Sequence, residues 1–313
     1  MSEIKDRVQK ILVDNALDFR IEKLPMVAAR PSISIDVNGD MVNDIEHVES
    51  QYFGLYNTKS GNILNTVKEG YTVSQNDEVV ELVLRGMDGF GELSVSKAGS
   101  LNDGRRVFIQ LGIDGFAKVG DDKIKRYVTV IDSNDGSTGL SIGIGDLTMS
   151  CANQFFKFYK AGEMKAKHAG KLEAKIEEFP ALITLALSNS MQLIDAYNEF
   201  ERTPCTQELL NTLVHDLLGY DRMFTPSDIL EAKNNRAIAN MNNLYNHIEK
   251  ETNQKGFNLW GLHSGVTSWT THQKQAPSRP NGRTESAMCG TNYKANQKSL
   301  DFALKQVGLK LVM

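Results

Sequence analysis

Hydrophobic and polar positions alternate over much of the first half of the chain. The spacing of apolar residues from Glu3 to about Asn15 predicts a helix, and a looser segment follows that ends near Pro31. Ser32–Val37 then alternates with a period of two and stops at Asn38-Gly39, a dipeptide typical of tight hairpin turns.

A second β unit is expected directly after it. Gln51–Asn57 and Ile63–Val67 flank the turn residues 59–62, and Tyr71–Val73 extends the unit. Asn76 stands where a helix N-cap is expected, and the residues after it have helical periodicity, with Gly86 near the end of the helix.

Residues 91–150 predict a meander of antiparallel strands. Two pairs of alternating segments are each joined by an Asn-Asp-Gly turn, at residues 102–104 and 134–136. Asn and Asp tolerate the left-handed backbone region and Gly enters it freely, which suits hairpin turns.

From Ala152 onward the pattern becomes helical. Helices are expected from Pro180 to Thr203-Pro204, over Thr206–Leu218 with Gly219 as the stop, from Thr225-Pro226-Ser227-Asp228 to about Lys250, over Phe257–His272 and over Thr291–Val307, with a polar loop at Gln275–Gly290. The sequence thus predicts an α+β fold: an N-terminal antiparallel β meander with helices, followed by a mostly helical half. We divide it into an N-terminal helix and extension (1–50), an α+β core (51–176) and a helical region (177–313).

Composition fits a soluble globular protein. The chain has 313 residues, 41% of them hydrophobic and 24% charged, which excludes a collagen-like, a wholly disordered or a small disulfide-rich protein. The N-terminus has no apolar signal-peptide region, and the most apolar stretch, Ala181–Leu187, is far shorter than the roughly 20 residues of a membrane span. Three widely spaced cysteines suit a reducing compartment. We therefore expect a cytoplasmic protein without membrane association.

The net charge of -4 conceals an uneven distribution. Residues 1–100 carry 10 basic and 16 acidic side chains, and residues 177–270 carry 6 and 12. The blocks between and after them are basic, with 12 against 9 in residues 101–176 and 7 against 2 in residues 271–313. Such blocks could be ordinary solvated faces, could bind each other between subunits, or could bind an anionic polymer.

No motif indicates an enzyme or a cofactor. A phosphate-binding loop of the G-x-x-x-x-G-K-[ST] type is absent, and the glycines at 136–145 fall in a hairpin rather than before a helix. His263, His272 and Cys289 could converge on a metal, but their spacing fits no zinc module. There is also no G-x-S-x-G sequence for a nucleophile. We expect a non-enzymatic protein without a cofactor or a metal site.

One segment interleaves lysines with aromatic residues, a composition found in proteins that bind single-stranded nucleic acid. It spans Asn153–Lys175, and its candidate contacts are Phe156, Lys157, Tyr159, Lys160, Lys165, Lys167 and Lys171. A helix with its rings in the core and its lysines in water explains the same pattern equally well. Further candidates are Arg105, Arg106, Lys123, Lys125 and Arg126 in the β meander, and Arg279 and Arg283 near the C-terminus.

The order of several segments resembles a known family. The segments are YFGLYNTKSGNIL, GYTVSQNDEVVE, AGSLNDGRRVFIQL, YVTVIDSNDGSTGLSIG, CANQ and NLWGLHSGVTSWTTHQ, which lie between about Gln51 and about Leu304. They are similar to the phage/plasmid-like proteins, a family catalogued as a domain of unknown function. The resemblance implies a mobile element and no particular reaction. The order of elements is also loosely similar to the single-strand annealing proteins of phages, an analogy of arrangement and not of motif.

These observations lead to two expectations about function. The first is a non-enzymatic phage or plasmid protein that binds single-stranded DNA and anneals strands in recombination. Its charge blocks would suit head-to-tail assembly into a homo-oligomeric ring or filament. The alternative is a protein–protein interaction module of a mobile element, an anti-host-defence or assembly factor with a host or phage protein as partner.

Overall fold

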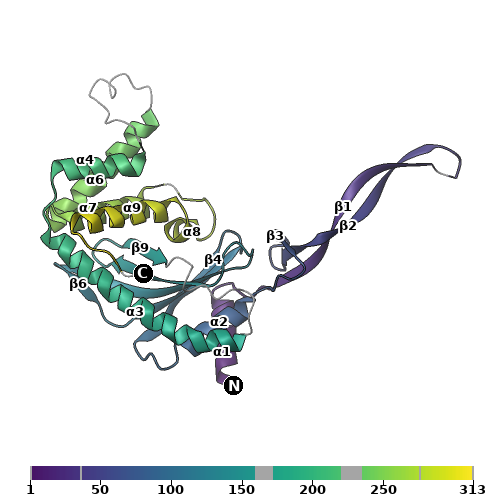
Figure 1. The fold of residues 1–313 in the computed structure, drawn as a ribbon, viewed down its shortest axis with the longest axis horizontal. Helices are drawn as coiled ribbons and strands as arrows, with labels where there is room; N and C mark the ends of the chain where they lie inside the picture. The colour runs from purple at the N-terminus through teal and green to yellow at the C-terminus, as the bar shows by residue number, and fades with distance from the viewer. Residues whose placement is uncertain (1, 36, 159–171, 220–234, 275, 312–313) are drawn as a thin grey trace.

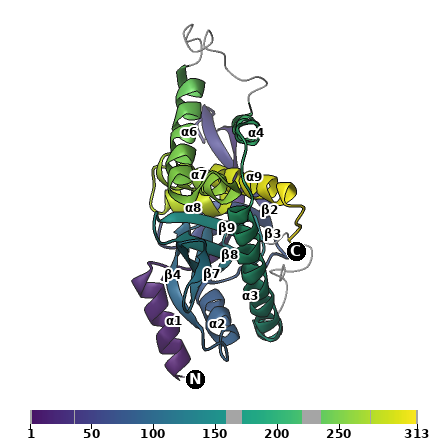
Figure 2. The same ribbon diagram turned by 90° about the vertical axis from the view of Figure 1, so that its left-hand side faces the viewer.

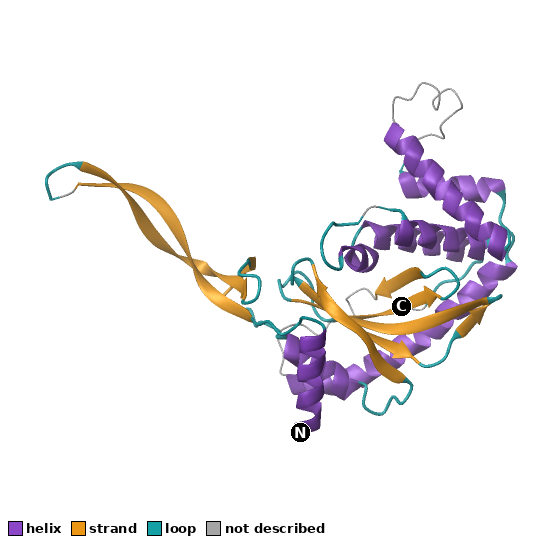
Figure 3. Ribbon diagram, turned by 180° about the vertical axis from the view of Figure 1, so that it is seen from behind, coloured by secondary structure: helices purple, strands orange, loops and turns teal. Residues whose placement is uncertain are grey.

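The computed structural model describes residues 2–35, 37–158, 172–219, 235–274 and 276–311. The fold is α+β, as the sequence predicts, with strands in the first half of the chain and most helices in the second (Figure 1). A six-stranded sheet forms the centre of the body, and a long two-stranded hairpin projects from one end of it (Figures 1 and 3).

The projecting hairpin belongs to a three-stranded antiparallel sheet. Helix α1 (Ser2–Asp14) precedes β1 (Ile21–Ile35), β2 (Met41–Asn57) and β3 (Ile63–Lys68), which are ordered β1-β2-β3. The predicted turn at Asn38-Gly39 is confirmed, whereas the looser segment predicted before Pro31 is wrong, because β1 begins at Ile21. Strand β1 tolerates Pro25 and Pro31 because it is an edge strand, and its register shifts between Pro25 and Val27.

Helix α2 (Asn76–Gly86) begins one residue earlier than an Asn76 cap would require. Gln75 is the N-cap, and its backbone N–H donates to the Glu78 carboxylate at 3.1 Å. Asn76 is buried instead, and its amide donates to the Leu17 carbonyl at 2.9 Å. The strand predicted at Tyr71–Val73 is wrong, because these residues form an irregular connection between β3 and α2.

The central sheet is antiparallel throughout and has the order β4-β5-β7-β8-β9, with β6 paired to β7. Both predicted Asn-Asp-Gly turns are confirmed as links between strands. The strands are β4 (Leu93–Leu101), β5 (Arg106–Ile113), β6 (Ala117–Val119), β7 (Asp122–Ser133), β8 (Ser141–Thr148) and β9 (Asn153–Phe158).

Strand β9 corrects the prediction that the chain is helical from Ala152. Strand β8 offers a free edge, and Asn153–Phe158 pairs with it. Phe155 and Phe156 then lie on opposite faces of the sheet, so both rings are buried in a strand, which a helix would not achieve here. The remainder of the predicted lysine-rich helix, residues 159–171, lies outside the described residues.

The second half of the chain is helical, as predicted. Thr206 caps α4 by accepting from the Leu209 N–H at 3.2 Å, and Gly219 ends that helix with a φ of +68°. Two details differ from the prediction: Pro180 lies inside α3 rather than at its start, and α8 forms within the predicted polar loop. The predicted helix start at 225–228 lies outside the described residues. The helices are α3 (Leu172–Arg202), α4 (Gln207–Leu218), α6 (Asn235–Lys255), α7 (Leu259–His272), α8 (Gly282–Cys289) and α9 (Thr291–Gln306).

The helices enclose the central sheet from both sides (Figures 1 and 2). Helix α3 lies along one face, α8 packs on the other, and α7 and α9 contact β9. Helix α2 packs on α3 through Gly86, where a Cβ atom would come within 2.2 Å of the Phe179 ring. In the described part of the chain, no helix is long and apolar enough to cross a membrane. The predicted divisions after residues 50 and 176 remain predictions, and both positions lie inside elements, β2 and α3.

Candidate functional site

The face of the central sheet opposite α3 is only partly covered. Residues that pair directly across antiparallel strands share a face. The register pairs Lys97 with Gln110, and Tyr127 with Gly145. Helix α8 covers one end of this face, where Met288 packs in a small cluster with Phe108 and Phe156. A pocket of about 200 Å³ remains beside the helix; its lining residues are Ser96, Lys97, Gln110, Tyr127, Asp146, Leu147, Gln154, Phe156 and Thr284.

This pocket, hereafter the sheet-face pocket, is polar and locally cationic. The Lys97 Nζ lies 3.5 Å from the Thr284 hydroxyl and 5.7 Å from the centre of the Phe108 ring. Lys125 follows on the same face as Tyr127, and burial raises the pKa of the Tyr127 phenol. The carboxyl group of Asp146 is directed to the opposite face, where its Oδ2 lies 3.4 Å from the Tyr197 hydroxyl on α3. A lysine, two glutamines and a tyrosine therefore define the chemistry of the pocket, with a second lysine beside it.

Arg105 and Arg106 lie at the end of the β4–β5 hairpin. The guanidinium of Arg105 is 3.8 Å from the Asp135 carboxylate and also donates to the Leu64 carbonyl. Arg106 lies 3.4 Å from the Ser137 hydroxyl, and its buried Nε has no hydrogen-bond partner. The structure thus gives both predicted arginines intramolecular contacts that order the turn region.

Arg279 and Arg283 lie at the start of α8. Arg279 donates twice to Glu285, at 3.0 and 2.7 Å, and lies 3.7 Å from Asp103. Hydrogen bonding to Glu285 raises the pKa of the Arg279 guanidinium further. Arg283 donates to the Thr271 carbonyl at 2.6 Å. Arg279 is therefore neutralised by two carboxylates of its own chain.

The predicted basic residues of the β meander do not form one patch. Arg106 pairs with Ser133 at one end of β7, whereas Arg126 lies seven residues away along that strand, about 23 Å. Lys125 and Arg126 also point to opposite faces, since Arg126 contacts the Met191 sulfur on α3 at 2.8 Å. Lys123 is exposed near the start of β7, where it pairs with Lys118 of β6. Of Lys123, Lys125 and Arg126, Lys125 is therefore the residue that lies beside the sheet-face pocket. Its Nζ donates to the Ile113 carbonyl at 2.6 Å.

The aromatic and lysine candidates of β9 are buried. Phe156 is 4% exposed and Lys157 is 6% exposed. The ring of Phe156 packs under α8, so the prediction that it is a free stacking platform does not fit this conformation. The other five candidates lie outside the described residues: Tyr159, Lys160, Lys165, Lys167 and Lys171.

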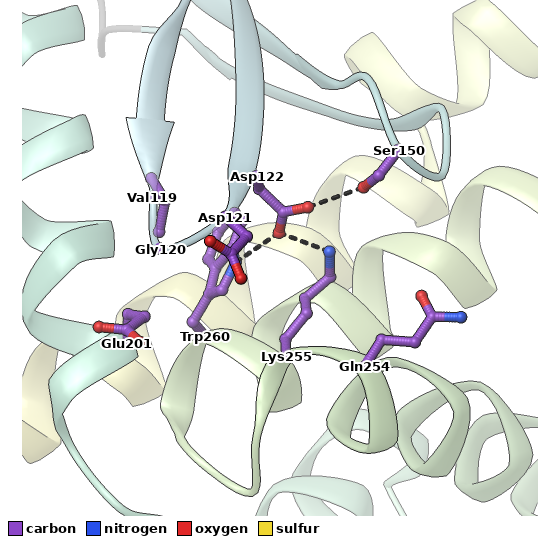
Figure 4. Close-up of a pocket in the computed structure, with 9 residues that line it drawn as sticks. All are labelled: Val119, Gly120, Asp121, Asp122, Ser150, Glu201, Gln254, Lys255 and Trp260. Atoms are coloured by element: carbon purple, nitrogen blue, oxygen red, sulfur yellow. Dashed lines mark hydrogen bonds and ion pairs between the residues drawn. The ribbon is translucent and has the colours of Figure 1, made fainter.

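A second pocket, of about 380 Å³, lies between the β6–β7 turn and the helices (Figure 4). Asp122 is at its centre and accepts from Lys255 at 2.5 Å, Trp260 at 2.9 Å and Ser150 at 2.7 Å. Burial raises the pKa of Asp122, but these three hydrogen bonds outweigh it and lower the pKa below its usual value. Lys255 also lies 3.5 Å from Glu251. Asp122 thus joins Ser150, Lys255 and Trp260 in one network, which ties the sheet to α6 and α7.

A third group of polar side chains is buried between β8, α3 and α7. Burial raises the pKa of Asp146 to about 7, although the Tyr197 hydroxyl and Arg126 lower it. Burial lowers the pKa of His263 to about 3, and its Nδ1 lies 3.0 Å from the Ser299 hydroxyl. Both groups are therefore neutral in the folded protein near pH 6.

The histidines and the cysteine considered as metal ligands are separate. His263 stacks in the aromatic cluster beside Tyr197, whereas His272 contacts the Cys151 carbonyl at 3.0 Å. Cys289 lies near Arg106. Across the described ranges, no group of three or more His, Cys, Asp or Glu side chains is arranged to hold a metal.

Nothing in the sequence pattern distinguishes Lys97, Gln110, Tyr127 or Gln154 from other strand residues. Each occupies an ordinary polar position of an alternating strand. Their signal lies only in the register between strands that are distant in sequence, because that register places them on one face.

The fold and the sheet-face pocket thus define an α+β protein with a polar, partly covered sheet face. The chain belongs to the family described as Domain of unknown function (DUF932), which matches residues 63–298. The resemblance to a family of unknown function is therefore confirmed, and that description names neither a phage nor an activity. No curated protein and no solved structure matches the chain.

Proposed function

We propose that the chain is a non-enzymatic protein that binds single-stranded nucleic acid on the partly covered face of its central sheet. The observation that supports this is the sheet-face pocket, where Lys97, Tyr127 and neutral amide side chains lie on one face beside Lys125. Unpaired bases stack on aromatic rings for about 1–3 kcal/mol each, and lysines neutralise the phosphates.

Local charge, rather than the net charge of -4, governs such a contact. Exposed charges more than about 8 Å away are largely screened at physiological ionic strength. The one carboxyl group among the residues that line the pocket, that of Asp146, is directed toward α3, and burial raises its pKa to about 7. The charged groups closest to a nucleic-acid backbone on this face would therefore be the lysines Lys97 and Lys125.

Strand annealing in the recombination of a phage or plasmid is the specific form of this proposal. A protein that holds a strand with its bases accessible lets base pairing supply the free energy, so no nucleotide hydrolysis is needed. Mixing two complementary labelled strands with the protein tests this step: annealing should be faster than in buffer alone.

Binding itself is tested by fluorescence anisotropy with a labelled 30-nucleotide strand and its duplex over about 50–300 mM salt. The strand should bind more tightly than the duplex. Substituting Lys97→Gln and Lys125→Gln together should weaken binding and lower the slope of log K against log salt by about 1.4, since each lost phosphate contact on a single strand contributes about 0.7. The control Lys5→Gln with Lys250→Gln removes the same charge from exposed positions on α1 and α6.

An unchanged slope in the Lys97/Lys125 variant would show that the sheet-face pocket does not contact the phosphates of the strand. Absence of binding at 50 mM salt would refute the proposal as a whole. The alternative, an interaction module that binds protein, is favoured by a different observation, the projecting hairpin.

A further inference from the structure

The hairpin that projects from the body is amphipathic. Its distal part, residues 27–49, is termed the arm. The register pairs Val27 with Glu49, Ala29 with His47, Pro31 with Ile45, Ile33 with Asn43 and Ile35 with Met41. Because paired residues share a face, most of the apolar residues lie on one side of the ribbon, where Asn43, His47 and Glu49 accompany them. This apolar face comprises Val27, Ala29, Pro31, Ile33, Ile35, Met41 and Ile45.

The apolar face is uncovered. Ile33 is 70% exposed, Ile35 71%, Met41 81% and Ile45 58%. The arm reaches away from the body (Figures 1 and 3). The opposite face is more polar: Arg30 lies 3.6 Å from Glu46, and Ser32 and Ser34 follow on the same strand, although Val42 and Val48 also lie there. Monomers rarely expose contiguous apolar patches of this kind, and a lone two-stranded ribbon is marginally stable in water.

We propose that the arm of a second copy of this chain covers the apolar face, so that two arms pack face to face. Residues 27–49 contain five acidic residues and one basic residue, a charge that opposes nucleic acid as the occupant. Among the pairs given above, the acidic residue on the apolar face is Glu49, at the base of the arm. The apolar faces are thus complementary to each other without bringing carboxylates together.

Charge on the outer faces does not prevent this packing. Stacked sheets lie about 10 Å apart, so acidic groups on the two outer faces are separated by well over the Debye length of about 8 Å. The arms run in opposite directions, because the body at the base of each arm is broad and two bodies do not fit side by side at that spacing (Figure 1). Glu49 of one copy then lies near the apolar tip of the other, away from its own counterpart.

The size of the contact sets its strength. Nine residue pairs give a face about 30 Å long and about 10 Å wide, so two faces bury about 600 Å². That area is below the 1,200–2,000 Å² typical of stable complexes. We therefore expect a dimer that dissociates in the micromolar range. The proposal is independent of nucleic-acid binding by the sheet-face pocket.

Light scattering coupled to size-exclusion chromatography tests it over about 1–200 μM full-length chain. The mass should rise from 34.8 kDa toward twice that value. Ile33→Asp with Ile45→Asp should weaken the dimer at least about tenfold, because both carboxylates would be buried without a partner. Ser32→Asp with Ser34→Asp adds the same charge to the opposite face and should leave the dimer intact.

Three results would overturn the proposal. The first is a wild-type chain that stays monomeric at every concentration, and the second is equal loss of the dimer in both double variants. The third comes from mixing: a tagged Ile33→Asp/Ile45→Asp chain has an intact body, so if it captures the wild-type chain, the arm docks on the body instead. Circular dichroism melting should be unchanged in both variants, because the four substituted side chains are in the arm and away from the body.

Discussion

Asp146 and His263 are buried titratable groups whose pKa values shift in opposite directions. The folded state keeps Asp146 protonated up to about pH 7, whereas the unfolded chain loses that proton near pH 4, so this group makes stability fall as pH rises between those values. His263 has a pKa of about 3 when folded and near 6.5 when unfolded, so it makes stability rise over that range. The two contributions oppose each other between about pH 4 and pH 6.5.

In the Asp146→Asn variant, the pH dependence of the free energy of unfolding should reflect His263 without the opposing effect of Asp146. The variant should gain stability relative to the wild type by up to about 1.4 kcal/mol for each pH unit between pH 4 and pH 7, because the amide has no proton for the unfolded chain to release. Urea unfolding at a series of pH values measures this. Asp114→Asn, at an exposed position, serves as the control, and curves of wild type and Asp146→Asn that stay parallel would contradict the assignment.

At the scale of elements, the short β6–β7 hairpin is held to the helices by one carboxylate. Asp122 begins β7 and binds groups from α6, α7 and the loop after β8 (Figure 4). The side chains of Lys255 and Asp122 are 6% and 10% exposed, so their ion pair is well shielded from solvent. Removing one partner of a buried pair leaves the other charge unpaired, which is more costly than the pair itself is stabilising.

Asp122→Ala should lower the free energy of unfolding by about 3–5 kcal/mol, toward the lower value because Glu251 stays near Lys255. Asp121→Ala removes the adjacent, exposed carboxylate and should change it by no more than about 0.5 kcal/mol. Chemical denaturation of the two variants compares them directly. If they are equally stable, the network does not anchor the hairpin.

At the scale of the whole molecule, the chain consists of a body and an arm joined at the base of one hairpin. The base is fixed by hydrogen bonds between Ile21 and Gln75 and between Lys23 and the backbone of Glu69 and Tyr71. The arm itself extends away from the body, so its folding and its contacts are separate from those of the central sheet (Figures 1 and 3).

Replacing residues 27–49 by Asn-Gly should therefore leave the body folded. The two residues suit a tight turn between the shortened strands. We expect the melting temperature of the body to stay within about 2 °C of the wild type at low micromolar concentration, as followed by calorimetry. A fall of more than about 10 °C would show that the arm supports the body.

The amino-acid sequence by itself determined the local elements with clear signals. The Asn-Gly and Asn-Asp-Gly turns, the cap and stop of α4, and the change from strands to helices follow from backbone preferences of a few neighbouring residues. Tertiary structure decided what those preferences leave open. Asn153–Phe158 became a strand because the edge of β8 was free, and β1 extends through two prolines because its outer edge needs no partner.

The candidate sites show the same division. Clusters of basic residues are visible in the sequence, but the register separates Arg106 from Arg126 and turns Lys125 and Arg126 to opposite faces. The same register brings Lys97, Gln110 and Tyr127 together from three strands. Side-chain direction alternates at every residue of a strand, so which side chains meet depends on strand pairing over long sequence distances, and only the folded chain sets that pairing.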